Sequence, residues 1–155
     1  MALQIGDKAP DFTLVSSDLS EVSLKDFAGK KVIIHFFPLA FTGVCTTQLC
    51  TMRDNFGYYE GQNAQVLGIS IDSPFVLAKF KEENNYQFPL LSDFNKEVSQ
   101  AFGAFYDEFK FNLKGVAKRA AFVIDENQKI IYAEVLENAG ELPNFKAIDE
   151  VIKSS

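Results

Sequence analysis

The chain has 155 residues, of which 47% are apolar and 23% charged, and its formal net charge is −6 at pH 7. This size and apolar content suffice for a single domain over residues 1–155, whose core needs neither metal nor disulfide support. The negative charge, without any lysine- or arginine-rich tract, argues against nucleic-acid binding. No stretch approaches the roughly 20 apolar residues that span a bilayer, and the start, MALQIGDKAPDF, lacks the features of a signal peptide.

The first half of the chain predicts a hairpin followed by a strand and a helix. Residues 11–15 and 22–24 lie on either side of the polar stretch SSDLS, which indicates an N-terminal β-hairpin. Residues 32–37 form an apolar run that Pro38 ends, as in a central strand buried on both faces. Apolar residues recur at helical spacing over 45–59, so we expect a helix there.

The second half continues the alternation of strands and helices and then changes to paired strands. In order, the expected elements are a strand over 65–71, a helix from 72–74 onward, a short helix over 95–102, strands over 120–124 and 129–134 around a turn at ENQ, and an amphipathic helix over 143–152. The middle of the chain looks irregular. This order predicts an α/β fold with a mixed central sheet flanked by helices.

The chain has two cysteines, Cys45 and Cys50, and one histidine, His35. Two cysteines are too few for a secreted disulfide framework and suit the reducing cytoplasm, where they are more often catalytic or metal-binding. A metal site is the weaker alternative, because His35 lies inside an apolar run. We therefore expect a cytoplasmic protein without metal or cofactor.

Cys45 lies in the turn between the first central strand and the helix that follows. Such turns lie at the carboxyl end of the strand, where open α/β sheets bind ligands. The free N–H groups and the dipole of a helix start favour a thiolate over a thiol. We interpret Cys45 as a nucleophile, and the alternative is an inert, buried cysteine.

Three neighbours of Cys45 are candidates for the same site. Thr42, three residues earlier, can direct its hydroxyl toward the sulfur or toward an oxygen that arrives there. Pro38 has no N–H group and can shield the pocket from water. His35 could act as a base, but in an apolar strand it is more simply a core residue with its hydrogen bonds satisfied.

The stretch PLAFTGVC resembles the P-x-x-x-T-x-x-C signature of the peroxiredoxins, which are thiol peroxidases with a thioredoxin-like fold. GDKAPDFTL resembles their N-terminal stretch, FPLLSD their middle loop, and KRAAFVID the strand that carries a catalytic arginine. The resemblance implies that Cys45 is the peroxidatic cysteine, that Thr42 orients the peroxide and that Pro38 shields it. It also implies that Arg119 stabilises the thiolate and binds the peroxide, although its position beside Lys118 fits a surface charge equally well.

The role of Cys50 stays open between a resolving cysteine and a core residue. In a regular helix the Cα atoms of residues five apart are roughly 8–9 Å apart, whereas a disulfide tolerates at most about 7 Å. A resolving Cys50, which we favour, therefore requires the helix to unwind after Cys45 becomes a sulfenic acid.

Two branches of the family differ on this point. The spacing in CTTQLC resembles the bacterioferritin-comigratory protein, or peroxiredoxin Q, branch, in which the second cysteine resolves. FFPLAFTG and VSQAFG resemble the alkyl hydroperoxide reductase E branch, which uses one cysteine and an external thiol. Gln48 stands where many peroxiredoxins have glutamate, and glutamine is familiar in the Q branch.

The resemblance implies a cofactor-free enzyme that reduces hydrogen peroxide and organic hydroperoxides. Thioredoxin, glutaredoxin or a low-molecular-weight thiol would regenerate it, and the protein would be a monomer or a homodimer. An alternative is a redox sensor that reacts once and is read by a binding partner. A thioredoxin-like disulfide reductase is disfavoured, because the C-x-x-C pair is absent.

Overall fold

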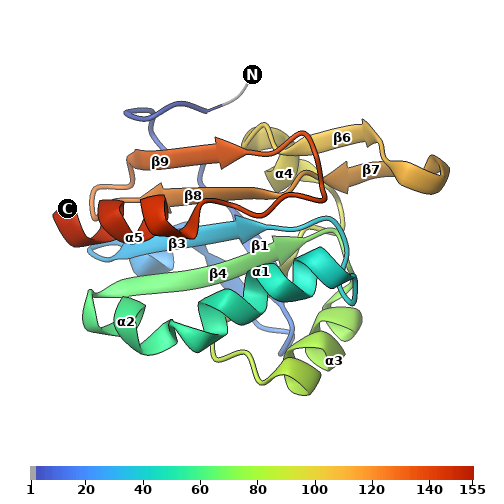
Figure 1. Ribbon diagram of the computed structural model, residues 1–155, viewed down its shortest axis with the longest axis horizontal. Coiled ribbons are helices and arrows are strands. Elements are labelled where there is room, and N and C mark those ends of the chain that lie inside the picture. Colours follow the sequence, from blue (N-terminus) through green and yellow to red (C-terminus); the bar gives the residue numbers. More distant parts are fainter. Residues whose placement is uncertain (1–2) are drawn as a thin grey trace.

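The computed structural model describes residues 3–155, which form a mixed sheet with helices on both faces (Figure 1). The strands of this sheet are β1 (Thr13–Ser16), β2 (Glu21–Ser23), β3 (Lys31–Phe36), β4 (Ala64–Ser70), β5 (Leu90–Ser92), β8 (Ala120–Ile124) and β9 (Ile130–Val135). Their spatial order is β2-β1-β5-β4-β3-β8-β9. β3, β4 and β5 are parallel and the remaining pairs are antiparallel, so the predicted α/β class, the mixed sheet and the N-terminal hairpin are confirmed.

Helices cover the two faces of the sheet unequally. They are η1 (Leu24–Phe27), α1 (Gly43–Asp54), α2 (Phe56–Gly61), α3 (Pro74–Asn84), α4 (Glu97–Ala101), η2 (Lys110–Asn112) and α5 (Phe145–Ser154). One core cluster joins Ile33 of β3 to α1 and α5, and a second joins Ile34 to α4 on the other face. All six residues of β3 are buried, and its apolar side chains alternate between these two clusters.

The helix expected over 45–59 is divided in two. Asn55 lies between α1 and α2 with φ −106° and ψ 14°, and its side-chain amide donates to the carbonyl of Thr51 at 2.9 Å. This local bond competes with the helical ladder, and Gly57, a weak helix former, lies two residues further on. The helix also begins at Gly43, two residues earlier than expected, which places Cys45 within its first turn.

The middle of the chain is more regular than expected. β6 (Phe105–Glu108) and β7 (Lys114–Ala117) form a separate antiparallel hairpin that projects beyond the main sheet (Figure 1). Phe111 and Asn112 at its tip have φ values of 61° and 60°. The prediction missed this hairpin because its tip lacks the Asn-Gly or Gly-rich turn that marks such connections.

Candidate active site

Cys45 lies where β3 gives way to α1. It is the third residue of α1 and is 0% exposed. Thr42 is the N-cap, but its side chain makes no capping hydrogen bond. The thiol therefore lies at the positive end of the helix dipole. The N-cap side chain does not accept a hydrogen bond from the backbone N–H groups of this first turn.

Arg119 reaches the same place from the neighbouring strand. Phe36, the last residue of β3, pairs with Ala120, the first residue of β8, and this register puts the preceding Arg119 beside the end of β3. Its Nη1 atom lies 3.3 Å from the Sγ atom of Cys45. The side chain is 2% exposed, so Arg119 is a buried cation rather than a surface charge.

The other hydrogen bonds that the guanidinium of Arg119 donates go to uncharged oxygen atoms. Nε and Nη2 donate to the carbonyl of Ala139 at 3.1 and 2.8 Å, and Nη1 donates to Oε1 of Gln48 at 2.8 Å. Within residues 3–155 Arg119 forms no ion pair with a carboxylate. Because a buried cation without an anion is costly, Cys45 is the neighbour that can supply the negative charge.

Pro38 and Thr42 line the cavity that leads to Cys45 and Arg119, which has a volume of about 210 Å³. The hydroxyl of Thr42 donates to the carbonyl of Leu39 at 2.8 Å, so of its two expected partners, the sulfur and an arriving oxygen, it does not donate to the sulfur. Since its one proton is engaged, the hydroxyl oxygen remains free to accept a hydrogen bond from an incoming molecule.

Residues from distant segments of the chain also line this cavity. Phe109 and Phe111, at the tip of the β6–β7 hairpin, and Gly140, after β9, line it. No sequence motif marked these residues, because distant segments bring them to Cys45. A larger cavity of about 500 Å³ lies beside β1 and α4, but neither cysteine lines it.

Asp72 anchors the loop that carries Pro38 and Thr42. Its Oδ2 atom accepts hydrogen bonds from the backbone N–H of Ala40 at 2.8 Å and from the hydroxyl of Ser70 at 2.7 Å. The loop after β3 is thereby tied to the end of β4. Asp72 therefore has a structural role at the end of β4.

Gln48 and His35 extend the network behind Arg119. Both are fully buried, and Nε2 of Gln48 lies 2.9 Å from Nδ1 of His35. Nε2 of His35 has no hydrogen-bond partner within residues 3–155, so the expectation of a satisfied core histidine holds for one ring nitrogen only. In the sequence, Gln48 stands out only because many peroxiredoxins have glutamate at this position.

The buried His35 predicts a loss of stability in acid. Burial first, and then the charge of Arg119, lower the pKa of His35 from 6.5 to about 3. The unfolded chain therefore protonates His35 below about pH 6.5, whereas the folded protein protonates it only below about pH 3. The free energy of unfolding consequently rises with pH across this window. From pH 7.5 to pH 5, the wild type should lose about 2 kcal/mol more than His35→Asn in urea unfolding. Equal losses would contradict this prediction.

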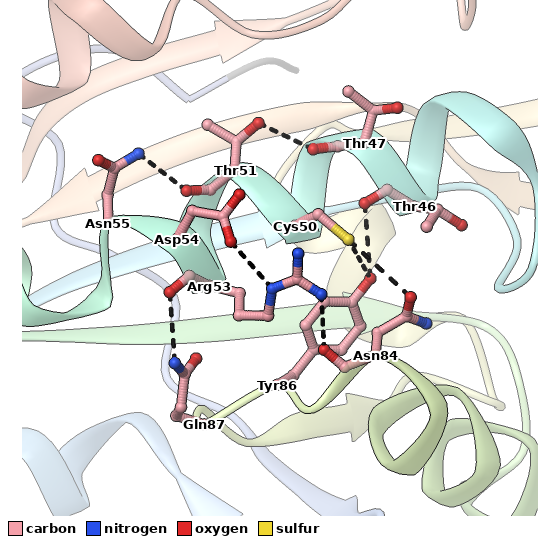
Figure 2. Close-up of polar contacts among 10 residues, drawn as sticks. All are labelled: Thr46, Thr47, Cys50, Thr51, Arg53, Asp54, Asn55, Asn84, Tyr86 and Gln87. Carbon is pink, nitrogen blue, oxygen red and sulfur yellow. Dashed lines mark hydrogen bonds and ion pairs between the residues drawn. The ribbon is translucent and has the colours of Figure 1, made fainter.

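Cys50 lies on another side of α1, about 140° around the helix axis from Cys45. Its Sγ atom is 3.6 Å from the hydroxyl of Tyr86 and 3.9 Å from Oδ1 of Asn84 (Figure 2). Arg53 reinforces this contact between α1 and α3 by donating to the carbonyl of Asn84 at 2.8 Å. Burial, followed by the contact with Cys50, raises the pKa of Tyr86 above its usual range. Both cysteines are free thiols.

Residues 3–155 contain no group of three or more histidine, cysteine, aspartate or glutamate side chains placed to hold a metal ion. Within the same residues, no helix combines the length and apolar character needed to cross a membrane.

Known proteins are similar to this chain in both sequence and fold. Residues 5–133 match the AhpC/TSA family. The peroxiredoxin Bcp of Escherichia coli K12 is 39% identical over 129 residues, or 83% of each chain. Alkyl hydroperoxide reductase E of Mycobacterium tuberculosis is 38% identical over 143 residues, or 90% of each chain. The crystal structure of the peroxidoxin BcpB from M. tuberculosis matches 98% of this chain and 97% of its own with a TM-score of 0.86 and 26% identity.

The family match extends over most of the chain, and the relatives cover more than two thirds of it. The solved relative has the same arrangement of a mixed sheet between helices, so the thioredoxin-like fold is confirmed. The chain therefore belongs to the AhpC/TSA family and is a peroxiredoxin, an enzyme that reduces peroxides at the expense of a thiol.

Proposed function

We propose that Cys45 is the peroxidatic nucleophile, and the observation that carries this assignment is its 3.3 Å contact with the buried Arg119. The Cys45 thiolate attacks one oxygen of the peroxide in line with the O–O bond. A sulfur–oxygen bond forms as the O–O bond breaks, and the leaving oxygen takes up a proton to become water or an alcohol. Cys45 is oxidised to a sulfenic acid and the peroxide is reduced by two electrons.

Arg119 and Thr42 are suited to hold the peroxide for this attack. Four of the five guanidinium N–H groups have protein partners, which leaves one on Nη2 for a peroxide oxygen. A fixed donor close to the leaving oxygen stabilises the charge that develops there. The oxygen of Thr42 can accept the peroxide O–H, and the buried Pro38 excludes water.

The walls of the cavity favour organic hydroperoxides as well as hydrogen peroxide. Leu39, Val44, Phe109 and Phe111 are apolar residues that line the same cavity as Cys45. An alkyl group attached to the peroxide can pack against these side chains while its O–O group lies near Arg119. Hydrogen peroxide needs only the polar part of the same site.

Cys50 is assigned as the resolving cysteine. Its thiol attacks the sulfenic sulfur of Cys45, the hydroxyl leaves as water, and a disulfide forms. This step requires α1 to unwind, because the helix is continuous over both cysteines.

The sequence of α1 makes that unwinding less costly. The segment begins with Gly43 and the β-branched Val44, both weak helix formers. Thr46 and Thr47 direct their hydroxyls to the carbonyls of Thr42 and Gly43, at 2.8 and 3.1 Å, and such bonds slightly destabilise a helix. Local opening therefore starts from a turn with low intrinsic stability.

Regeneration completes the proposed cycle. Two electrons from thioredoxin, glutaredoxin or a low-molecular-weight thiol reduce the disulfide back to two thiols. We assign this cycle to one domain, acting as a monomer or a homodimer in the cytoplasm, where such reductants keep thiols reduced.

Intact-protein mass spectrometry tests the resolving step. Reduced protein receives one equivalent of hydrogen peroxide or of a bulky alkyl hydroperoxide, without added thiol. The wild type should lose two hydrogens with either oxidant, because the Cys45–Cys50 disulfide forms. Cys50→Ser should instead gain oxygen, since the sulfenic acid has no partner.

Two other outcomes would each contradict part of the proposed cycle. A wild type that gains oxygen while Cys50 still reacts with an alkylating reagent would be a one-cysteine enzyme that depends on an external thiol. A wild type that reacts with hydrogen peroxide alone would contradict the assignment of organic hydroperoxides.

A further inference from the structure

We propose that His35 is a positioning residue: its Nδ1 atom orients the side-chain amide of Gln48, whose oxygen in turn holds the guanidinium of Arg119. The inference rests on the proposed function, in which Arg119 binds the peroxide beside Cys45. His35 itself neither lines the cavity nor contacts the sulfur. Its effect on the reaction must therefore pass through Gln48.

The amide of Gln48 is engaged at both ends. Its Nε2 atom lies 2.9 Å from Nδ1 of His35 and 3.3 Å from the carbonyl oxygen of Phe36, while its Oε1 atom accepts from Arg119 at 2.8 Å. A carbonyl only accepts and a guanidinium only donates. If the amide of Gln48 were flipped, its Nε2 donor would face the Arg119 donor, and its Oε1 acceptor would face the carbonyl oxygen of Phe36.

This arrangement defines the tautomer of His35. Because Nε2 of Gln48 donates, Nδ1 of His35 must accept, and the ring proton therefore lies on Nε2. Burial first, and then the charge of Arg119, lower the pKa of His35 to about 3, so the ring is neutral at physiological pH. A protonated ring would donate from both nitrogens and would oppose the amide of Gln48.

An imidazole at this position of the core is energetically unfavourable, because one of its buried nitrogens is unsatisfied in the described part of the chain. Its Nε2 atom has no hydrogen-bond partner within residues 3–155, and the ring of Phe145 lies beside it with centroids 6.0 Å apart. An apolar residue of similar volume would remove this unsatisfied ring nitrogen, but it would leave one N–H of the buried Gln48 amide without its acceptor. What such a residue cannot supply is the Nδ1 acceptor, and His35 provides it at a shorter distance than Phe36 does.

A double-mutant cycle on the rate of Cys45 oxidation by hydrogen peroxide tests this dependence. His35→Leu should slow the reaction about tenfold, through misplacement of Arg119. Gln48→Leu should slow it at least as much, and the double variant should be no slower than Gln48→Leu alone, because His35 acts through Gln48. His35→Asn, which retains an acceptor near Nδ1, should stay within about threefold of the wild type. If the rate reductions of His35→Leu and Gln48→Leu multiplied in the double variant, the proposal would be overturned.

Nitrogen NMR of the wild type gives a second test that needs no variant. The chain has a single histidine, so the imidazole signals belong to His35. They should report a proton on Nε2, none on Nδ1, and no titration between about pH 5 and pH 8. A proton on Nδ1 would overturn this inference alone, whereas a wild type that does not react with peroxide would overturn the proposed function.

Discussion

Cys45→Ser is expected to lower the rate of peroxide consumption by at least about a thousandfold. A serine hydroxyl in the first turn of α1 could still face Arg119, but it stays protonated at neutral pH and is a much weaker nucleophile than a thiolate. The measurement is peroxide loss with reductant in excess. A variant that kept the wild-type rate would remove Cys45 from the mechanism.

Two comparisons make this result specific. Cys50→Ser should consume the first equivalent of peroxide at the wild-type rate and then stall with thioredoxin as reductant, because it removes only the resolving thiol. Thr47→Ser is the matched control on α1, since Thr47 is exposed and does not line the cavity. It should keep the full activity within about twofold, as expected for a surface change. Loss of activity in Thr47→Ser would mean that α1 tolerates no substitution here.

The local part of the site could be predicted from the sequence. Pro38, Thr42 and Cys45 lie within eight consecutive residues, and the change from an apolar strand to a helix start places all three at one edge of the sheet. The structure brings them to one cavity, as expected. The direction of the Thr42 hydroxyl could not be predicted from the sequence, because it is determined by a hydrogen bond to the backbone carbonyl of Leu39 in the same loop.

The non-local part required the fold. Arg119 is 74 residues from Cys45, and only the antiparallel register of β3 and β8 brings the two together. Gln48 lies one helical turn beyond Cys45, yet its importance comes from the Arg119 and His35 side chains on its two sides. Family resemblance identified Arg119, whereas no periodicity in the sequence distinguishes it from the neighbouring Lys118.

Arg119→Leu should slow Cys45 oxidation by about 10²–10³-fold, comparable to the loss of a donor that stabilises developing charge. Leucine removes the cation from the site and leaves Oε1 of Gln48 and the carbonyl of Ala139 without their donor. The rate is measured by stopped flow with hydrogen peroxide in pseudo-first-order excess. A reduction smaller than about threefold would mean that the thiolate is stabilised mainly by the start of α1.

Arg119→Lys separates charge from geometry. An ammonium keeps the positive charge but is a single point, so it cannot hold Ala139, Gln48 and the peroxide with fixed, planar donors. We therefore expect a rate between those of Arg119→Leu and the wild type.

The adjacent Lys118→Leu removes the same formal charge. Its Nζ atom pairs with Glu137 at 2.7 Å, and the residue does not line the cavity. This variant should stay within about twofold of the wild type, because the ion pair lies outside the cavity and its acidic partner, Glu137, is 80% exposed. Equal losses in Lys118→Leu and Arg119→Leu would instead indicate that net charge around the cavity, rather than the buried guanidinium, drives the reaction with peroxide.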